Sequence, residues 1–315
     1  MATEPITSTV AARSRLGWSA SRRRVMRAKE WVIESGLFLA AASSVLITMG
    51  IVGVLGYESA AFFRHVSLRE FLTETQWTPL FADARFGILP LVTGTLVTTV
   101  VALLVAIPVG TICAVWLSEY ASYRLREVIK PAIELLSAVP TIVFGYFALL
   151  FVTPLLQRLI PGLPGFNMLS AGLVIGIMVV PYVTSLSEDA MRTVPAALRE
   201  GAYALGATRI QVAWRVVFPS ALSGITAAYI LTVSRALGET MIVAVAAGMQ
   251  PNLTLDPTEP AATITAYIVQ VSLGDLPHQS IGYQSIFAAG LTLLVLTLVL
   301  NVVGHLIQRR FREAY

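Results

Sequence analysis

Charged residues are scarce in this sequence of 315 residues, at 13% of the chain against about 25% in an ordinary soluble domain. Hydrophobic residues make up 56%, and they gather in long runs without charge. The length alone would allow two soluble domains, but these runs favour a single integral-membrane bundle. A nucleic-acid-binding protein is disfavoured as well, because the basic residues lie in short segments beside the apolar runs.

Cysteine, histidine and lysine are nearly absent, and each absence excludes a class of site. The single cysteine, Cys113, excludes a disulfide within the chain. None of the three histidines has a neighbouring Cys or His, so we predict no metal site. Neither Lys29 nor Lys130 follows a glycine, so the chain lacks the Gly-x-x-x-x-Gly-Lys-Ser/Thr pattern of a P-loop. We therefore expect the chain not to be an enzyme.

The apolar runs predict an all-α, polytopic membrane protein with six transmembrane helices, since one crossing takes about 20 apolar residues. The expected domains are a basic N-terminal segment, 1–32, and a six-helix domain, 33–315, with a loop near 188–219. Prolines are expected to kink or interrupt several spans, as at Pro108, Pro140, Pro154 and Pro181. The predicted spans are 36–56, 89–117, 135–157, 168–187, 221–248 and 283–307.

The distribution of positive charge predicts the orientation of these spans. Seventeen Lys and Arg residues lie in the N-terminal segment, the 119–134 and 188–219 loops and the C-terminal tail, whereas four lie in the opposite loops. By the positive-inside rule both termini are cytoplasmic, and an even number of spans requires the same answer. The outward segments 57–87 and 249–281 are long enough to cover a pore or meet an external partner, and a solvated connector explains them equally well.

The most informative stretch is REGAYALGATRIQVAWRVVFPSALSG, residues 199–224. Pro195 suits the first turn of a helix, with Thr193 nearby as a cap, and Gly206 is expected to end that helix. A second short helix is expected from Thr208 to Pro219. Together they predict a compact helix–turn–helix on the cytoplasmic side.

Small and charged side chains on this helix–turn–helix, which we call the knob, predict contact with another protein. Ala202 would let the knob enter a groove of that protein, while Arg199 and Glu200 would pair with charges at the rim.

This stretch resembles the coupling loop of ABC importer permeases, whose pattern is Glu-Ala-Ala, three residues, Gly, nine residues, Ile, one residue, Leu-Pro. The chain departs from the pattern at three positions, all by mild changes. The resemblance implies that the loop docks into a separate ATP-hydrolysing subunit, which binds ATP and Mg, and that the chain has no cofactor of its own. Glu200, Ala202, Gly206 and Pro219 match the pattern, and the three departures are Gly201 for Ala, Val216 for Ile and Phe218 for Leu.

Two further stretches resemble span signatures of phosphate-specific (Pst-type) permeases, closer to the PstC than to the PstA subunit. They are IELLSAVPTIVFGYFALLF, 133–151, and SRALGETMIVAVAAG, 234–248. The resemblance implies an importer of inorganic phosphate in the bacterial plasma (inner) membrane. It also implies three partners, namely a second permease subunit, cytoplasmic ATPase subunits and an external phosphate-binding protein.

Sulfate and molybdate permeases carry the same Arg-Ala-Leu-Gly-Glu segment, so another oxyanion stays an alternative substrate. An ion-coupled secondary transporter is a rival class, with Glu239 as its coupling carboxylate. A signalling scaffold would bind the same partners without moving solute. An intramembrane enzyme is disfavoured, because the spans carry no plausible nucleophile–base or His/Asp constellation. The Glu188–Asp189 pair is interpreted as a solvated helix end rather than a catalytic dyad.

Arg235 and Glu239 stand four residues apart inside an apolar run. Arg235 would lie about 21 Å along a helix that starts near Ala221, at mid-membrane, where an arginine costs about 2.5–3.5 kcal/mol. A guanidinium fork matches phosphate oxygens, so we expect Arg235 to attract the anion and Glu239 to orient Arg235 and limit its affinity. A salt bridge that fixes helix packing is an equally weighted alternative. The expected hydroxyl donors nearby are Ser234, Thr240 and Thr232.

Overall fold

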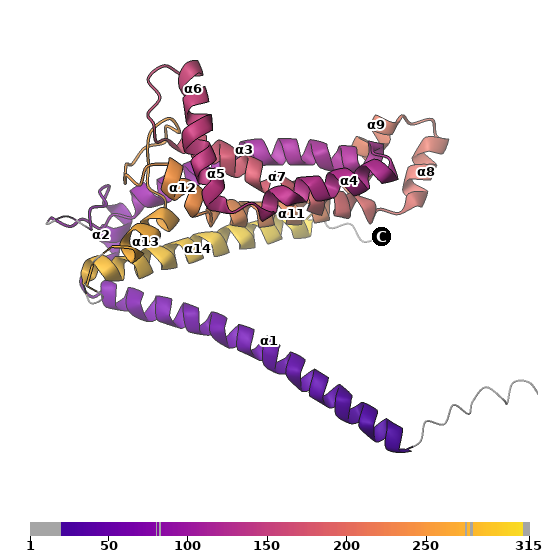
Figure 1. The fold of residues 1–315 in the computed structure, drawn as a ribbon, viewed down its shortest axis with the longest axis horizontal. Helices are drawn as coiled ribbons and strands as arrows, with labels where there is room; N and C mark the ends of the chain where they lie inside the picture. The colour runs from indigo at the N-terminus through magenta and orange to yellow at the C-terminus, as the bar shows by residue number, and fades with distance from the viewer. Residues whose placement is uncertain (1–19, 80, 82, 275, 278–279, 311–315) are drawn as a thin grey trace, which may run out of the picture. The chain divides into compact units, whose positions relative to one another are not determined.

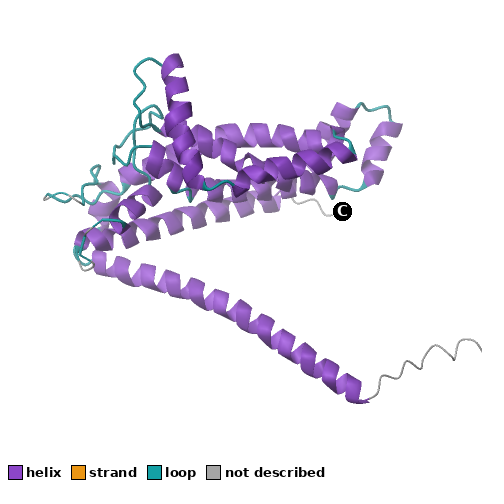
Figure 2. Ribbon diagram, viewed as in Figure 1, coloured by secondary structure: helices purple, strands orange, loops and turns teal. Residues whose placement is uncertain are grey.

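The computed structural model describes residues 20–79, 81, 83–274, 276, 277 and 280–310. Every regular element within these residues is a helix, and the only β-pairings among them are two isolated bridges (Figure 2). The predicted all-α class is therefore confirmed. The chain divides into two units, 1–54 and 55–315, and helix α1 (Ala20–Phe62) carries it from the first into the second. The basic residues before position 20 lie outside the described residues.

Four long helices of the second unit form its bundle, namely α3 (Leu89–Val115), α7 (Met168–Arg192), α11 (Leu222–Leu237) and α14 (Ile281–Arg310). α7 packs against both α3 and α11, and α11 packs against α14 (Figure 1). The α3–α7 crossing depends on small residues: a Cβ atom on Gly176 would lie 2.7 Å from the carbonyl oxygen of Ala102. Two helix backbones approach this closely only where glycine and alanine occupy the contact.

Threonine hydroxyls inside α3 satisfy their hydrogen bonds within the helix. Thr98 and Thr99 donate to the carbonyls of Gly94 and Thr95, at 2.8 and 2.7 Å. The Thr95 hydroxyl donates to the Leu91 carbonyl at 2.7 Å and accepts the backbone N–H of Ile264 at 3.0 Å. An apolar helix can bury these polar side chains because none is left unpaired.

The third predicted span is a chain of short helices rather than one long helix. It consists of a 3₁₀ turn (Leu135–Ala138), α5 (Thr141–Phe147), a π turn (Ala148–Val152) and α6 (Thr153–Leu159), and α4 (Tyr123–Glu134) precedes it. Pro140 immediately precedes α5 and Pro154 lies in the first turn of α6, where a missing N–H is tolerated. The predicted connection 119–134 between the second and third spans is largely helical, because α4 occupies most of it.

Prolines in the other spans do not end their helices. Pro108 lies inside α3 and Pro181 inside α7, and both helices continue past them. Five described helical segments are long and apolar enough to cross a membrane: Lys29–Phe62, Leu89–Tyr120, Thr141–Leu159, Met168–Arg192 and Ile281–Arg309. A sixth is counted if Arg209–Ser220 and α11, which meet at 72°, form one span.

Aromatic side chains organise one end of the second unit. Phe62, Phe71, Trp77 and Phe86 pack edge to face, and Trp77 meets Tyr267 with ring centroids 5.0 Å apart. Phe62 is the last residue of α1, Phe71 lies in α2 (Leu68–Thr73), and Tyr267 lies in α13 (Ile264–Ser272). The described residues of the 57–87 segment thus include a packed aromatic cluster.

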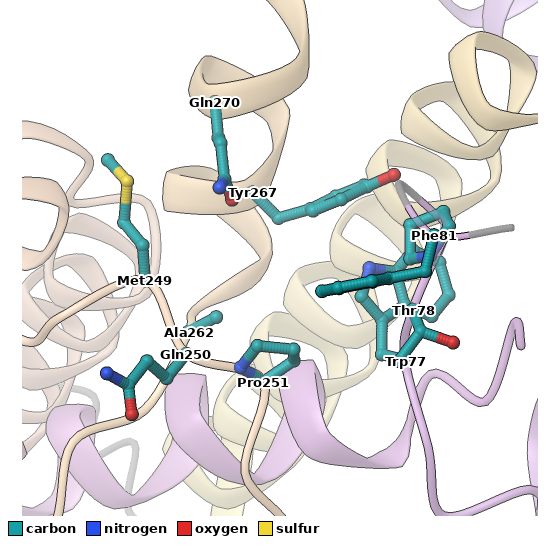
Figure 3. A pocket seen from close by; sticks show the side chains of 10 residues that line it. Trp77, Thr78, Phe81, Met249, Gln250, Pro251, Ala262, Tyr267 and Gln270 are labelled. Atoms are coloured by element: carbon teal, nitrogen blue, oxygen red, sulfur yellow. The ribbon is translucent and has the colours of Figure 1, made fainter. Parts of the chain in front are cut away.

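Beside this cluster lies a cavity of about 290 Å³ (Figure 3). None of its described lining residues is Lys or Arg. The cavity therefore offers no positive charge to an anion. Its lining is Trp77, Thr78, Pro79, Phe81, Met249, Gln250, Pro251, Ala262, Tyr267 and Gln270.

Candidate functional site

The knob predicted from the sequence is present at the end of the second unit opposite the aromatic cluster (Figure 1). We define the coupling knob as α8 (Ala196–Ala204), α9 (Arg209–Val212) and the turn between them. A π turn (Ala213–Val217) and α10 (Phe218–Ser220) connect it to α11, with Pro219 inside α10. Thr208 begins α9, and its backbone N–H donates to Gln211 Oε1 at 2.8 Å. The predicted helix–turn–helix is confirmed.

Gly206 ends α8 as the sequence predicts. Its φ of +82° lies in the left-handed region, and its N–H donates to the Tyr203 carbonyl at 2.9 Å. The Ala207 N–H donates to the Ala202 carbonyl at 3.1 Å, which completes a Schellman motif. The start of α8 differs from the prediction: the Thr193 hydroxyl donates back to the Ala190 carbonyl at 2.8 Å and caps nothing in α8.

The turn of the coupling knob presents its side chains outward. Leu205 is 90% exposed, and Glu200 is exposed without an ion pair or hydrogen bond among the described residues. A Cβ atom on Gly201 would meet nothing within 4 Å. Ala202, in contrast, packs partly against the apolar cluster under the knob. The exposed part of the motif is thus free to contact another protein.

Arg199 lies elsewhere than the rim where the sequence placed it. Its side chain is 20% exposed and points back from α8, with Nη2 3.1 Å from Glu119 Oε1. The same guanidinium donates to the carbonyl oxygens of Met191, at 2.8 Å, and Val194, at 2.7 Å. Arg199 therefore holds the coupling knob to the ends of two long helices.

The fifth span is broken where the sequence predicted a continuous helix over 221–248. α11 ends at Leu237 and α12 (Met241–Ala246) begins after three residues, so the continuous helix was wrong. Glu239 explains the break, because its Oε1 accepts the backbone N–H of Met241 at 3.1 Å and of Ile242 at 3.5 Å. A carboxylate that caps α12 in this way stabilises a new helix start.

Arg235 and Glu239 meet across this break. Arg235 lies in the last turn of α11, and its Nη2 is 4.0 Å from Glu239 Oε2. The Arg235 side chain is 41% exposed, whereas that of Glu239 is 2% exposed. The Thr265 hydroxyl donates to the Glu239 carbonyl at 2.7 Å and fixes the backbone of the break. Glu239 is thus held in place, and Arg235 presents an open side.

The three predicted hydroxyl donors point to different neighbours. Ser234 donates to Asn301 Oδ1 on α14 at 2.7 Å, which ties α11 to α14. Thr232 is buried and donates to the Ala228 carbonyl at 2.8 Å. Thr240 is partly exposed within the break, and its hydroxyl lies 3.2 Å from the Gly238 carbonyl. Of the three, Thr240 shares the break with Arg235 and Glu239.

Glu188 is not part of a solvated helix end, so that interpretation was wrong. Its side chain is fully buried, and Lys130 Nζ lies 2.6 Å from both Glu188 Oε2 and Asp189 Oδ1. Arg126 and Arg192 approach the same carboxylate, at 3.9 and 3.7 Å. Burial lowers the pKa of Lys130, but hydrogen bonds to Asp189 and Glu188 outweigh it and leave the pKa raised. This ionic cluster joins α4 to α7.

Sequence reasoning missed Glu119, Asn301 and Thr265, which come from elements distant along the chain. Glu119 did give a signal, since it is the residue that ends the charge-free run after Arg85. His278 lies outside the described residues, so the absence of a metal site stays a prediction. Within the described residues no group of three or more His, Cys, Asp or Glu is arranged to hold a metal ion.

Residues 106–313 match the family described as "Binding-protein-dependent transport system inner membrane component". The chain is 33% identical to the phosphate transport system permease protein PstC of Mesorhizobium japonicum, covering 86% of this chain and 88% of that protein. It is 34% identical to PstC of Xylella fastidiosa, covering 76% and 78%, and 34% identical to the probable ABC transporter permease YqgH of Bacillus subtilis, covering 85% and 86%. These relatives are transport permeases and not enzymes.

Solved structures agree with this family in fold. A bacterial ABC transporter involved in import of the acidic polysaccharide alginate aligns with a TM-score of 0.64 at 18% identity, over 93% of this chain and 100% of that chain. The MetNI methionine ABC transporter aligns with a TM-score of 0.53 at 17% identity, over 72% and 95%. The chain is therefore an integral membrane permease with the ABC importer fold, and it belongs to the family of binding-protein-dependent transport system inner membrane components.

Proposed function

We propose that this chain is the permease subunit of an ATP-driven importer of inorganic phosphate. The observation that carries the proposal is the pair of features in one bundle: a coupling knob with an exposed motif at one end, and an arginine at a helix break. Relatives named as phosphate permeases support the substrate.

The energy for import comes from a partner. ATP and Mg would bind to a cytoplasmic ATPase, because the chain lacks a P-loop. The exposed Glu200, Gly201 and Leu205 are the surface we assign to that contact. A second permease subunit would form the other half of the pore, since both are needed to enclose a path.

The orientation follows from charge and function together. The coupling knob must face the cytoplasm to meet the ATPase, and this places both termini on the same side, in the bacterial plasma (inner) membrane. The aromatic end of the bundle then faces outward. An external phosphate-binding protein would dock there. A periplasmic protein is bound in a solved structure of the alginate transporter, which supports this kind of partner.

Arg235 is the residue we assign to the anion path, with Glu239 and Thr240 beside it. A guanidinium that is 41% exposed cannot face lipid at this depth without a cost of about 2.5–3.5 kcal/mol or more. It must face water, an anion or the second subunit. Glu239 would hold Arg235 at 4.0 Å, close enough to orient it and too far to neutralise it fully. Ser234 would contribute by holding α11 against α14.

Two alternatives lead to different measurements. A sulfate or molybdate importer would share the coupling knob and differ in selectivity. A secondary transporter would need Glu239 to bind a coupling ion, and this reading is disfavoured because Glu239 already caps α12 and is nearly inaccessible.

The test is uptake of radiolabelled phosphate into right-side-out or reconstituted vesicles that contain the complete assembly and enclose ATP. We expect uptake to require ATP hydrolysis and to resist excess sulfate. If excess sulfate competes with phosphate for uptake, the substrate assignment is wrong and another oxyanion is the substrate. If uptake persists without ATP, the ATP-driven mechanism is wrong.

A further inference from the structure

The most extensively hydrogen-bonded side chain of the coupling knob, Arg199, points away from the exposed surface of Glu200, Gly201 and Leu205. Arg199 starts on α8 and ends among acceptors from three other segments: the end of α7, the connection after it, and the end of α3. Nη2 donates to the Met191 carbonyl at 2.8 Å, and Nη1 donates to the Val194 carbonyl at 2.7 Å. One side chain thus bridges the coupling knob and the bundle.

The third partner of Arg199 is the carboxylate of Glu119, 80 positions earlier in the chain. Glu119 is 5% exposed, and both of its oxygens lie within 3.4 Å of Arg199 Nε. The Ser118 hydroxyl donates to Glu119 Oε1 at 2.8 Å. A nearly buried carboxylate with two donors is held in one position, so force applied to Arg199 reaches the backbone of Glu119.

Glu119 belongs to a π turn (Trp116–Tyr120) that continues α3. The Ala121 N–H donates to the Trp116 carbonyl at 2.9 Å, the i→i+5 bond of that turn. The π turn Ala213–Val217, described above, lies at the other side of the coupling knob. π turns are rare and occur frequently at functional sites.

Apolar packing couples the same elements. Buried residues of α3, α7 and the π turn Ala213–Val217 form one cluster under the coupling knob, and Ala202 packs against it. This packing opposes movement of α8 toward α3, whereas the Arg199–Glu119 ion pair opposes movement of α8 away from α3. The buried members are Ala114, Val115, Met191, Val194, Val212, Ala213, Val217, Ala221 and Ile225.

We propose that the Arg199–Glu119 pair is the strut that transmits movement between the coupling knob and α3. This inference rests on the proposed function and adds a division of labour within it. Glu200, Gly201 and Leu205 touch the ATPase, while Arg199 and Glu119 are positioning residues that make α8 and α3 move as one body. A signal from the external face reaches the ATPase through this pair.

The first test measures ATP hydrolysis by the complete assembly in vesicles, with and without the external binding protein loaded with phosphate. Glu119→Ala removes the strut and leaves the Arg199 bonds to Met191 and Val194 intact. We expect basal hydrolysis and co-purification of the ATPase to be unchanged and stimulation by the binding protein to fall about 10-fold, within the usual range of coupling between sites. Glu127→Ala, an exposed carboxylate on α4, is the matched control and should keep full stimulation.

A double-variant cycle separates a strut from two independent contacts. Glu119→Ala combined with Arg199→Gln should lower stimulation no further than Arg199→Gln alone, because both changes break the same connection. If the losses of stimulation caused by the two substitutions multiply in the double variant, Arg199 and Glu119 act independently and the proposal is wrong.

The second test needs neither phosphate nor transport. Spin labels at Leu205→Cys, on the turn of the coupling knob, and Val109→Cys, exposed on α3, report the distance between these elements in a Cys113→Ser background. We expect one narrow distance with and without nucleotide in the native chain, and a broadened, nucleotide-dependent distance in Glu119→Ala. A narrow, unchanged distance in Glu119→Ala would overturn the strut, even if the variant also assembles poorly.

The two proposals fail in different ways. If the native assembly shows no ATP-dependent phosphate uptake, the proposed function is wrong, whereas the distance measurement still decides the strut. If native uptake is normal and Glu119→Ala keeps full stimulation, the strut alone is wrong.

Discussion

Two of the arginine–glutamate pairs among the described residues, Arg199–Glu119 and Arg235–Glu239, differ in sequence separation, distance and exposure. Arg199 and Glu119 are 80 positions apart, lie 3.1 Å from each other and are mostly buried. Arg235 and Glu239 are four positions apart and lie 4.0 Å from each other, with the arginine 41% exposed. In the first arginine, all three guanidinium nitrogens donate to fixed acceptors. The second keeps donors open on one side.

The difference indicates two kinds of work. A closed, multiply bonded guanidinium fixes geometry, so Arg199 suits the transmission of movement. An open guanidinium held by a distant carboxylate can accept another anion and release it, so Arg235 suits a transient site. Each prediction below is designed to break or sharpen this contrast.

Arg235→Gln should have the largest effect on uptake. A hydrogen bond to a charged group contributes about 1.5–3 kcal/mol, which corresponds to a loss of roughly 10- to 100-fold in the phosphate uptake rate. The measurement is initial uptake at matched membrane abundance of the assembly. Normal uptake by this variant would make Arg235 structural at most, and the contrast would disappear.

Glu239 combines a cap and a charge, and two substitutions separate them. Glu239→Ala removes the cap of α12 and the partner of Arg235, so we expect about a 10-fold loss of uptake and a lower thermal midpoint, since a cap contributes about 0.5–2 kcal/mol. Glu239→Gln keeps an acceptor for the N–H of Met241 and removes only the charge. Its thermal midpoint should stay near native, while phosphate release slows because Arg235 binds more tightly. Equal thermal losses in both variants would contradict the capping role.

Gly206 and Gly201 make a matched pair on the coupling knob. Gly206→Ala forces an L-residue into φ +82° and should cost about 1–2 kcal/mol, whereas Gly201→Ala has open space in a helix interior and should gain about 0.5–1 kcal/mol. Hydrogen exchange of the α8 amides measures both, with about 10-fold in protection for each 1.4 kcal/mol. Equal protection in the two variants would show that the left-handed turn is not required.

The smallest predicted effect concerns the ionic cluster around Glu188, which should change the thermal midpoint of unfolding only at alkaline pH. The pKa of Lys130 is raised, so its stabilisation is complete below the ordinary lysine pKa of about 10.4 and is lost as pH rises through the higher folded value. The thermal midpoint should be flat with respect to Lys130 between about pH 6 and 9 and fall above about pH 10.4.

Lys130→Arg should remove part of that alkaline fall, because arginine keeps its charge. Lys29→Arg exchanges the other lysine of the chain and is the control. Identical alkaline curves for native protein and Lys130→Arg would show that the cluster does not contribute.

The sequence predicted much of this fold, because membrane spans are encoded locally. Runs without charge located α3, α7 and α14 closely, and the glycine pattern located the coupling knob. The break at Gly238–Thr240 was missed, since Glu239 reads as a buried charge until its bonds to the Met241 and Ile242 amides are seen. Partners distant in sequence, such as Glu119 for Arg199 and Lys130 for Glu188, have no spacing rule that would reveal them.

The contrast between the two pairs is tested most directly by measuring two quantities on the same vesicles: phosphate uptake, and ATP hydrolysis stimulated by the loaded external binding protein. The account predicts that Arg235→Gln loses uptake and keeps stimulated hydrolysis, whereas Glu119→Ala loses stimulated hydrolysis and, with it, uptake. If both variants lose stimulated hydrolysis to the same extent, the two pairs do not have separate roles and the account is contradicted.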